Sequence, residues 1–94
     1  MAQFVIRIQL NGVPKESVWE QLDHAMERSG FNRYIEAGGN FYQMPDGEYV
    51  GTSTMTRSAL LEVVRRAVES AWKDYGLLVT EGQCTFDLPI IPQQ

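Results

Sequence analysis

Residues 41–56, FYQMPDGEYVGTSTMT, decide the fold that the sequence predicts. They contain two stretches of strand-forming residues, 41–44 and 48–54, with PDG at positions 45–47 between them. A proline presets φ early in a turn, and Gly47 can adopt a positive φ. The segment therefore predicts a β-hairpin that leads into a helix.

One strand and one helix are predicted before this hairpin. Residues 4–10 alternate between the two faces of a strand. The apolar face consists of Phe4, Ile6, Ile8 and Leu10. One face of the sheet is therefore expected against helices, and the other partly in water. In the helix that follows, Ser17 and Glu20 have the spacing of a capping box, and Gly30 suits the turn that ends it.

Residues 31–37 predict a second strand, which the segment GGN at 38–40 interrupts before the hairpin. We expect the two glycines to form a bulge within one long strand, with a separate turn as the alternative. After the hairpin, Thr56 or Ser58 is expected to cap a second helix. Its wide apolar face, which suits packing on a sheet, consists of Leu60, Val63, Val64, Ala67, Val68, Ala71 and Trp72.

One more strand is expected after the second helix. The helix is predicted to end at residues 75–76, because a glycine interrupts it there. Residues 82–88 then form the last strand, in which alternate apolar side chains share one face. Pro89 and Pro92 are expected to stop further pairing.

The predicted order is strand, helix, strand, strand, helix, strand. Two split βαβ units joined by a hairpin give a ferredoxin-like α+β sandwich, as a single domain over residues 1–94. Both helices would cover one face of a four-stranded antiparallel sheet with strand order 4-1-3-2. The first strand is then central, and Arg7 lies in the middle of the open face.

The composition indicates a small globular domain. Of its 94 residues 44% are hydrophobic, enough for one modest core that dimerisation would help to stabilise. Eight Lys and Arg against twelve Asp and Glu give a net charge of −4. This balance argues against sequence-independent nucleic-acid binding, and we expect no DNA partner.

The N-terminus enters a strand pattern directly, without a basic segment followed by an apolar one. No apolar run approaches the length of a membrane span. We therefore expect a cytoplasmic protein with no membrane partner.

The sequence contains one cysteine and one histidine, the residue types that most often carry metal or redox chemistry. Cys84 is the only cysteine, and we expect a buried apolar thiol in a strand rather than a reactive one. His24 is the only histidine, and a surface position is favoured over a general base. The sequence therefore predicts no metal site and no cofactor.

The remaining charged residues form no defined cluster. The only close basic group consists of Arg57, Arg65 and Arg66. Glu62 and Glu69 lie at pairing distance along the same helix, so a solvated face is favoured over a phosphate site. The acidic residues around the hairpin, Glu36, Asp46 and Glu48, are too dispersed to predict a carboxylate pair.

The open face of the sheet suggests two kinds of function. Part of the set Tyr34, Tyr42 and Tyr49 is expected near Arg7 there, as in proteins that stack the bases of single-stranded RNA on a sheet. The alternative, which we favour for this face, is a dimer interface, because a half-polar face with aromatic residues suits the stacking of two small domains.

Several short motifs spread over most of the chain resemble one family. They are the opening strand at 4–10, SVW at 17–19, MPDGEY at 44–49 running into ST at 53–54, and SAL at 58–60. Together they resemble the GhoS-like antitoxins, which are small ferredoxin-like endoribonucleases of type V toxin–antitoxin systems. The resemblance implies metal-independent cleavage of a messenger RNA and kinship with the small dimeric CRISPR adaptation nucleases.

The chain departs from this family at two places. The end of the first strand, residues 8–10, has no Asp where the family has one. The first helix carries Gln21, Asp23 and Glu27 where the antitoxin has basic residues. No catalytic residue is therefore carried over from the family.

We expect an RNA-acting antitoxin that forms a homodimer and binds single-stranded RNA. Arg7 is the candidate catalytic residue, because its guanidinium would stabilise the charge on the phosphate. Arg57, Tyr34 and Tyr49 are the candidate RNA-binding residues. The alternative is a non-catalytic module, homodimeric or protein-binding, that uses the open sheet face or an edge strand.

Overall fold

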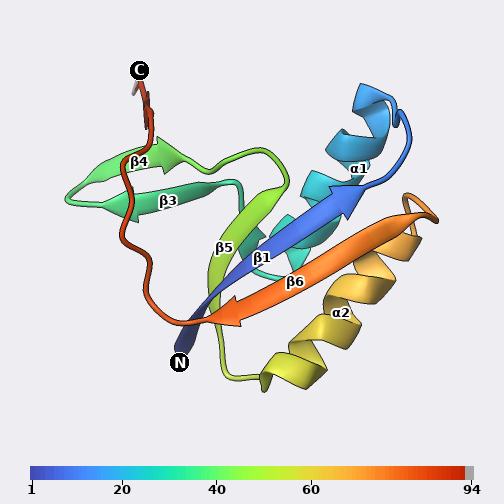
Figure 1. Ribbon diagram of the computed structural model, residues 1–94. Coiled ribbons are helices and arrows are strands. Elements are labelled where there is room, and N and C mark those ends of the chain that lie inside the picture. The colour runs from blue at the N-terminus through green and yellow to red at the C-terminus, as the bar shows by residue number, and fades with distance from the viewer. Residues whose placement is uncertain (93–94) are drawn as a thin grey trace.

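A computed structural model describes residues 1–92 as an α+β chain with two helices and two antiparallel sheets (Figure 1). In chain order the elements are β1 Ala2–Leu10, α1 Glu16–Arg28, β2 Phe31–Asn32, β3 Tyr34–Ala37, β4 Asn40–Gln43, β5 Glu48–Ser53, α2 Arg57–Glu69, β6 Tyr75–Glu81 and β7 Ile90–Ile91. The predicted α+β class is confirmed. The single four-stranded sheet is corrected to one of four strands, β2-β5-β1-β6, and one of three, β3-β4-β7.

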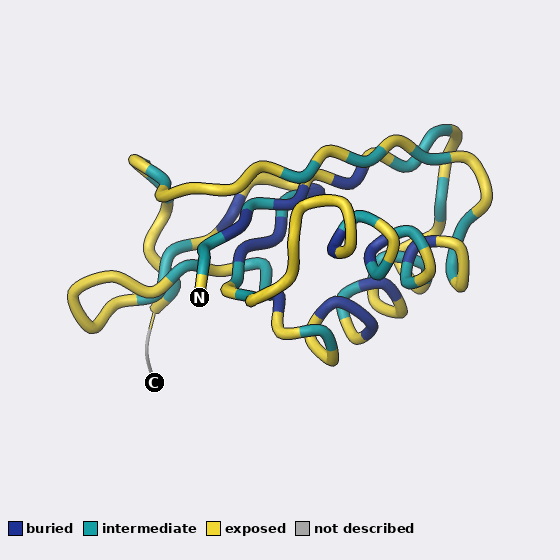
Figure 2. Tube along the Cα trace, turned by 90° about the horizontal axis from the view of Figure 1, so that it is seen from below, coloured by how far each residue is buried: buried dark blue, intermediate teal, exposed yellow. Residues whose placement is uncertain are grey.

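The four-stranded sheet is built around β1, which pairs antiparallel with β5 on one edge and with β6 on the other. Both helices lie on the same side of this sheet (Figure 2). The alternation predicted for β1 is confirmed, because Phe4, Ile6 and Ile8 are buried while Arg7 and Gln9 are exposed. The fully buried cluster between sheet and helices consists of Phe4, Ile6, Ile8, Leu22, Met26, Phe31, Tyr49, Leu60, Val64 and Val68.

The turn at residues 45–47 does not close a hairpin. β4 pairs with β3 and β7, whereas β5 pairs with β1 and β2, so this turn carries the chain from one sheet to the other. The Glu48 N–H donates to the carbonyl of Pro45 at 3.0 Å, and the Ile8 N–H donates to the carbonyl of Gly47 at 2.7 Å. Gly47 has a φ of 77°, so the predicted turn is confirmed. The prediction that the strands on its two sides pair with each other is wrong.

The glycines at 38 and 39 form a turn, not the bulge that we expected. Their φ values are 58° and 81°, and they join β3 to β4 in a tight hairpin. Positive φ at both central residues matches the twist of the flanking strands. The expected long second strand is therefore divided into β2, β3 and β4.

The helix ends agree only in part with the sequence. Thr56 caps α2, because its Oγ1 accepts a hydrogen bond from the Ala59 N–H at 3.1 Å, and Gly30 follows α1 with a positive φ, as predicted. The capping box at Ser17 is wrong, since the N-cap of α1 is Lys15, two residues earlier, and it makes no side-chain capping bond. The second helix ends at Glu69, ahead of the predicted end at 75–76, so the residues from Ser70 to Asp74 form a loop.

The last main strand lies earlier than predicted. β6 starts at Tyr75 and ends at Glu81, and residues 82–89 belong to no strand. Pro89 and Pro92 do not prevent pairing, because Ile90–Ile91 form β7 against β4. β7 lies at the edge of its sheet, where a proline without an N–H is tolerated.

The second sheet lies against part of the open face of the first. Val50 points to this face, opposite Val5, yet only 6% of it is exposed because the β3–β4 hairpin packs there. The chain after β6 returns across the same side to β4 (Figure 1). Arg7, Gln9 and Leu78 lie beyond this cover and are exposed.

Within residues 1–92, neither helix has the length and apolar character needed to cross a membrane.

The turn between the two sheets gives a first prediction. A Cβ at Gly47 would lie 2.6 Å from the carbonyl oxygen of Ile8, in a backbone region that L-residues avoid. We expect Gly47→Ala to lower the free energy of unfolding by about 2–4 kcal/mol in urea denaturation. Gly39→Ala is the matched control. Its φ is also positive, but beyond its chain neighbours no described atom lies within 4 Å of a Cβ there, so it should cost only about 1–2 kcal/mol. Equal losses would contradict the role of the close contact.

Candidate functional site

Arg7 occupies the position that the sequence predicted, in the middle of the central strand on the open face. Its direct partners are Glu48 on β5 and Leu78 on β6. Direct cross-strand partners share a face, with Cα atoms about 4.5–5.5 Å apart. Neither Arg7 nor Glu48 takes part in an ion pair among the described residues. A guanidinium and a carboxylate thus lie side by side with their hydrogen-bonding capacity unused.

The sequence analysis grouped Glu48 with Glu36 and Asp46 as too dispersed for a site, and did not place it beside Arg7. Glu48 follows the turn at 45–47, and the expected hairpin would have paired it with β4 instead of β1. It also lines a cleft of about 310 Å³ together with Val5, Asp87 and Met44. Asp87 reaches this cleft from the segment after β6 and not from a strand, contrary to the sequence-based expectation.

Arg57 is remote from Arg7. It is the first residue of α2, and its Nε lies 4.0 Å from Glu81 Oε1. Glu81 is the direct partner of Phe4, whose side chain faces the helices, so Arg57 lies on the opposite side of the sheet from Arg7. The two arginines therefore cannot hold the same phosphate group.

Tyr49 does not lie on the open face. It is the partner of Ile6 and is fully buried under the helices, so no base can stack on its ring. Its hydroxyl donates to Asp23 Oδ1 at 2.5 Å. Burial raises the pKa of Tyr49 well above its ordinary value, and the hydrogen bond to Asp23 raises it further.

Asp23 belongs to a polar chain that ties the helix to both sheets. Arg33, between β2 and β3, contacts Asp23 at 3.6 Å and Asp46 at 3.3 Å. Its Nε is buried and has no hydrogen-bond partner within residues 1–92. Because two carboxylates already surround this guanidinium, we assign the cluster a structural role. The sequence analysis identified Asp23 only as an acidic residue of the first helix where the antitoxins have basic residues.

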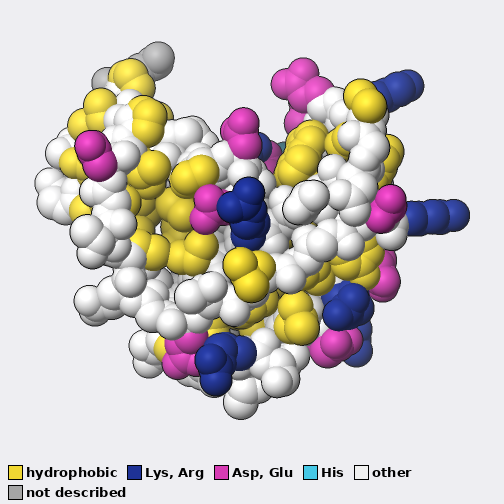
Figure 3. Space-filling view, in the orientation of Figure 1, with side chains coloured by type: hydrophobic (Ala, Val, Ile, Leu, Met, Phe, Trp, Pro, Cys, Tyr) yellow, Lys and Arg dark blue, Asp and Glu magenta, His cyan; other side chains and the backbone are white. Residues whose placement is uncertain are grey.

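Tyr34 lies where an aromatic ligand could reach it. It is 40% exposed on the β3–β4 hairpin, and its ring meets that of Phe41 edge to face at 5.3 Å. It borders a cleft of about 400 Å³ between the hairpin and the open face of the four-stranded sheet. Figure 3 shows apolar side chains gathered in the hollow between the two sheets, with basic side chains dispersed around it. Of the predicted RNA-binding residues, Tyr34 alone lies beside the open face.

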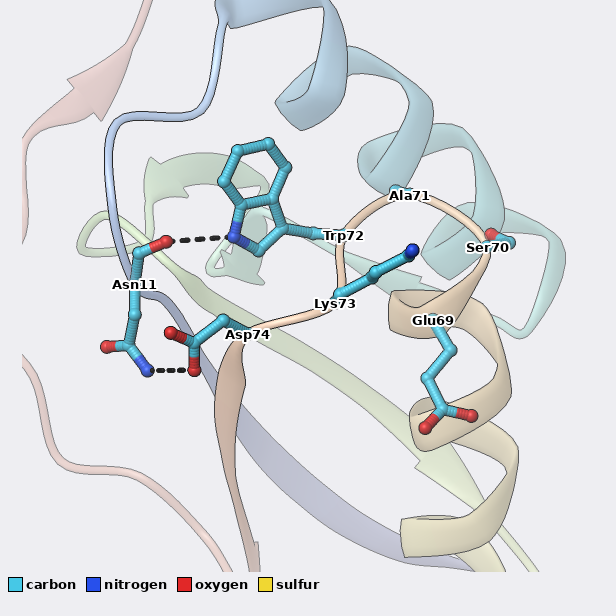
Figure 4. A pocket seen from close by; sticks show the side chains of 7 residues that line it. All are labelled: Asn11, Glu69, Ser70, Ala71, Trp72, Lys73 and Asp74. Carbon is cyan, nitrogen blue, oxygen red and sulfur yellow. Dashed lines mark hydrogen bonds between the residues drawn. The ribbon is translucent and has the colours of Figure 1, made fainter.

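A cavity of about 650 Å³ lies at the turn before β6 and is drawn in Figure 4. The Trp72 indole N–H donates to the carbonyl of Asn11 at 2.9 Å, and the Asn11 amide donates to Asp74 at 3.0 Å. Lys73 and Glu69 extend away from the indole (Figure 4). The polar groups at the centre of this cavity therefore bind one another, and they connect the β1–α1 loop to the α2–β6 loop.

The single histidine and the single cysteine lie in different parts of the fold. His24 is exposed on α1, as predicted. Cys84 is half-buried outside any strand, where its sulfur accepts from the Gln3 amide at 3.4 Å, so the expected strand position is wrong. In the described part of the chain, no group of three or more His, Cys, Asp or Glu residues could hold a metal ion.

No protein-family model and no curated protein matches the chain.

The buried hydroxyl gives a second prediction. Tyr49→Phe should lower the free energy of unfolding at pH 7 by about 1–2 kcal/mol in urea, because the hydrogen bond to Asp23 is lost. The folded chain holds the Tyr49 proton more tightly than the unfolded chain, so this stabilisation is complete below about pH 10 and decreases at higher pH. Above pH 10 the free energy of unfolding of the parent should fall with pH more steeply than that of the variant, by about 1.4 kcal/mol per pH unit. An unchanged slope would contradict the assignment.

Proposed function

We propose that this protein is a ferredoxin-like RNA-acting protein related to the endoribonuclease antitoxins of type V toxin–antitoxin systems. The observation that carries the proposal is the juxtaposition of Arg7 and Glu48 on the exposed face of the sheet. The kinship is supported by the strand order of the four-stranded sheet, β2-β5-β1-β6. If β1, β2, β5 and β6 are numbered 1 to 4 in chain order, this sheet has the ferredoxin-like order 4-1-3-2, counted from β6.

The two side chains supply what metal-independent RNA cleavage requires. The 2′-hydroxyl attacks the adjacent phosphorus, so that a 2′-O–P bond forms and the P–O5′ bond breaks. Glu48 takes the proton of the hydroxyl as general base, and the leaving oxygen receives a proton from water. Arg7 stabilises the charge that develops on the phosphate oxygens. The products are a 2′,3′-cyclic phosphate and a 5′-hydroxyl.

This assignment also accounts for the missing Asp at the end of β1. The residues at 8–10 carry no carboxylate, but the neighbouring strand brings Glu48 beside the same arginine. Arg57 has no part in this chemistry, because it lies on the helix side of the sheet.

The third prediction tests the pair directly. With single-stranded RNA in the presence of EDTA, Glu48→Gln and Arg7→Ala should each slow cleavage at least about 100-fold. The control is Glu62→Gln, which removes an exposed carboxylate from α2 on the helix side of the sheet and should leave the rate unchanged. Circular dichroism and thermal melting show whether each variant is folded. Cleavage at the parental rate by either test variant would remove the role assigned to that residue.

A second candidate function, a homodimeric binding module, is favoured by the edge of β6. In residues 1–92 no strand pairs with its outer edge, and its seven residues include no Lys, Arg or Pro to discourage pairing. Leu78, at its centre, is 59% exposed. Antiparallel pairing of two β6 strands about Leu78 would set Tyr75 of one copy opposite Glu81 of the other. Arg65, which donates to the Tyr75 hydroxyl at 3.3 Å, would then lie near that carboxylate.

The fourth prediction concerns this edge. Analytical ultracentrifugation of the parent should give a dimer, and Leu78→Lys should shift it to a monomer, because a lysine at the centre of the edge opposes strand pairing. Val13→Lys is the control, since Val13 is 93% exposed but lies outside β6. A parent that is monomeric at all concentrations, or a dimer unaffected by Leu78→Lys, would overturn this candidate.

A further inference from the structure

The cleft beside Tyr34 has a floor and a wall that come from different sheets. The floor is the open face of the four-stranded sheet, where Gln3 and Thr52 are direct partners and Asn32 lies opposite Val50. The wall is the β3–β4 hairpin, which contributes Tyr34, Glu36 and Phe41. The volume of about 400 Å³ falls within the range of small-molecule sites, about 300–1,000 Å³.

The polar groups of this cleft are largely unused. In the part of the chain that the structure describes, the side chains of Asn32, Thr52 and Glu36 make no hydrogen bond or ion pair. The Tyr34 hydroxyl is likewise without a partner there. Gln3 donates to Cys84 through its amide nitrogen, which leaves its carbonyl oxygen available. This pattern differs from the Trp72 cavity, where the central polar groups bind one another.

The charge of the lining determines what can enter. Among the described residues that line the cleft there is no Lys or Arg, and Glu36 is the only charged one. A phosphate would meet repulsion here, whereas a neutral ring with hydrogen-bond donors would meet an acceptor. The exposed ring of Tyr34 offers a flat apolar surface on which a planar heterocycle can stack.

We propose that this cleft binds a guanine base. The guanine N1–H and N2–H₂ groups donate side by side, and a carboxylate can accept both at once through its two oxygens. Glu36 serves as this acceptor, Tyr34 stacks on the ring, and the amide of Asn32 donates to the guanine carbonyl oxygen. Adenine and uracil lack the paired donors and would bind more weakly.

The inference rests on the proposed RNA-related function in one respect, namely that the guanine belongs to single-stranded RNA. Gln3 and Arg7 are four residues apart on β1, a distance of about 14 Å along the strand. A guanine held in the cleft would therefore lead the adjoining single-stranded RNA toward Arg7 and Glu48. A free guanine nucleoside presents the same base chemistry without phosphates.

The test is a titration of the whole protein, followed by the backbone amide signals of the cleft in NMR spectra. Guanosine should bind more tightly than inosine, which lacks the N2 amino group, and at least about tenfold more tightly than adenosine or uridine. Glu36→Gln should abolish the difference between guanosine and inosine, and Tyr34→Ala should weaken the binding of every nucleoside. Glu20→Gln is the control, because Glu20 is exposed on α1, on the other side of the sheet.

A second arm separates the two sources of the base and the two proposals. Oligonucleotides with one guanine should be bound and cut near that base, and Glu36→Gln should remove this positional preference. Guanosine binding without RNA binding would support the cleft as a nucleoside site and count against the RNA-related function. RNA cleavage whose position is unaffected by Glu36→Gln and Tyr34→Ala, or equal affinity for all nucleosides, would overturn the inference while leaving the proposed cleavage by Arg7 and Glu48 intact.

Discussion

The structure depends on the register of β1, which is paired on both edges. Its alternation sends Phe4, Ile6 and Ile8 into the core and leaves Arg7 and Gln9 outside. A slip of one residue would reverse every side chain, burying a guanidinium and exposing the apolar set. The same register fixes the neighbours of Arg7, because pairing with β5 and β6 brings Glu48 and Leu78 to either side. The register of β1 therefore determines both the composition of the core and the position of the candidate catalytic pair.

The second sheet gives the open face its shape. The turn at Gly47 is locked to β1 by the hydrogen bond from Ile8, and Arg33 contacts both Asp23 and Asp46. These contacts hold the β3–β4 hairpin against one part of the open face. A sheet that would otherwise be a flat half-polar surface is thereby divided into a cleft lined by Tyr34 and an exposed strip that carries Arg7. The proposed base-binding cleft and the proposed catalytic pair therefore lie in adjacent regions of the sheet.

Local signals in the sequence predicted the parts of the fold that local chemistry controls. The alternation of β1, the apolar face of α2, the Thr56 cap and the positive φ of Gly47 needed only neighbouring residues. The larger failures concern partners distant in the chain, although the Ser17 cap, the bulge at 38–39 and the end of α2 were also predicted wrongly. A proline-glycine turn is the same whether the strands beside it pair with each other or with two different sheets. The short β7 was missed because the prolines around it usually oppose pairing, a rule that an edge strand escapes.

By itself the sequence determined the α+β class, the exposed place of Arg7 on a central strand and the exposure of His24. Only the tertiary structure decided which residues stand beside Arg7. In the tertiary structure Tyr49 lies in the core, where its hydroxyl donates to Asp23, and Arg57 lies on the opposite side of the sheet from Arg7. The tertiary structure also brings Glu48 next to Arg7 from the far side of a turn. The physical reason is that side-chain direction along one strand follows from alternation, whereas the neighbour across a sheet depends on which strands pair and in what register.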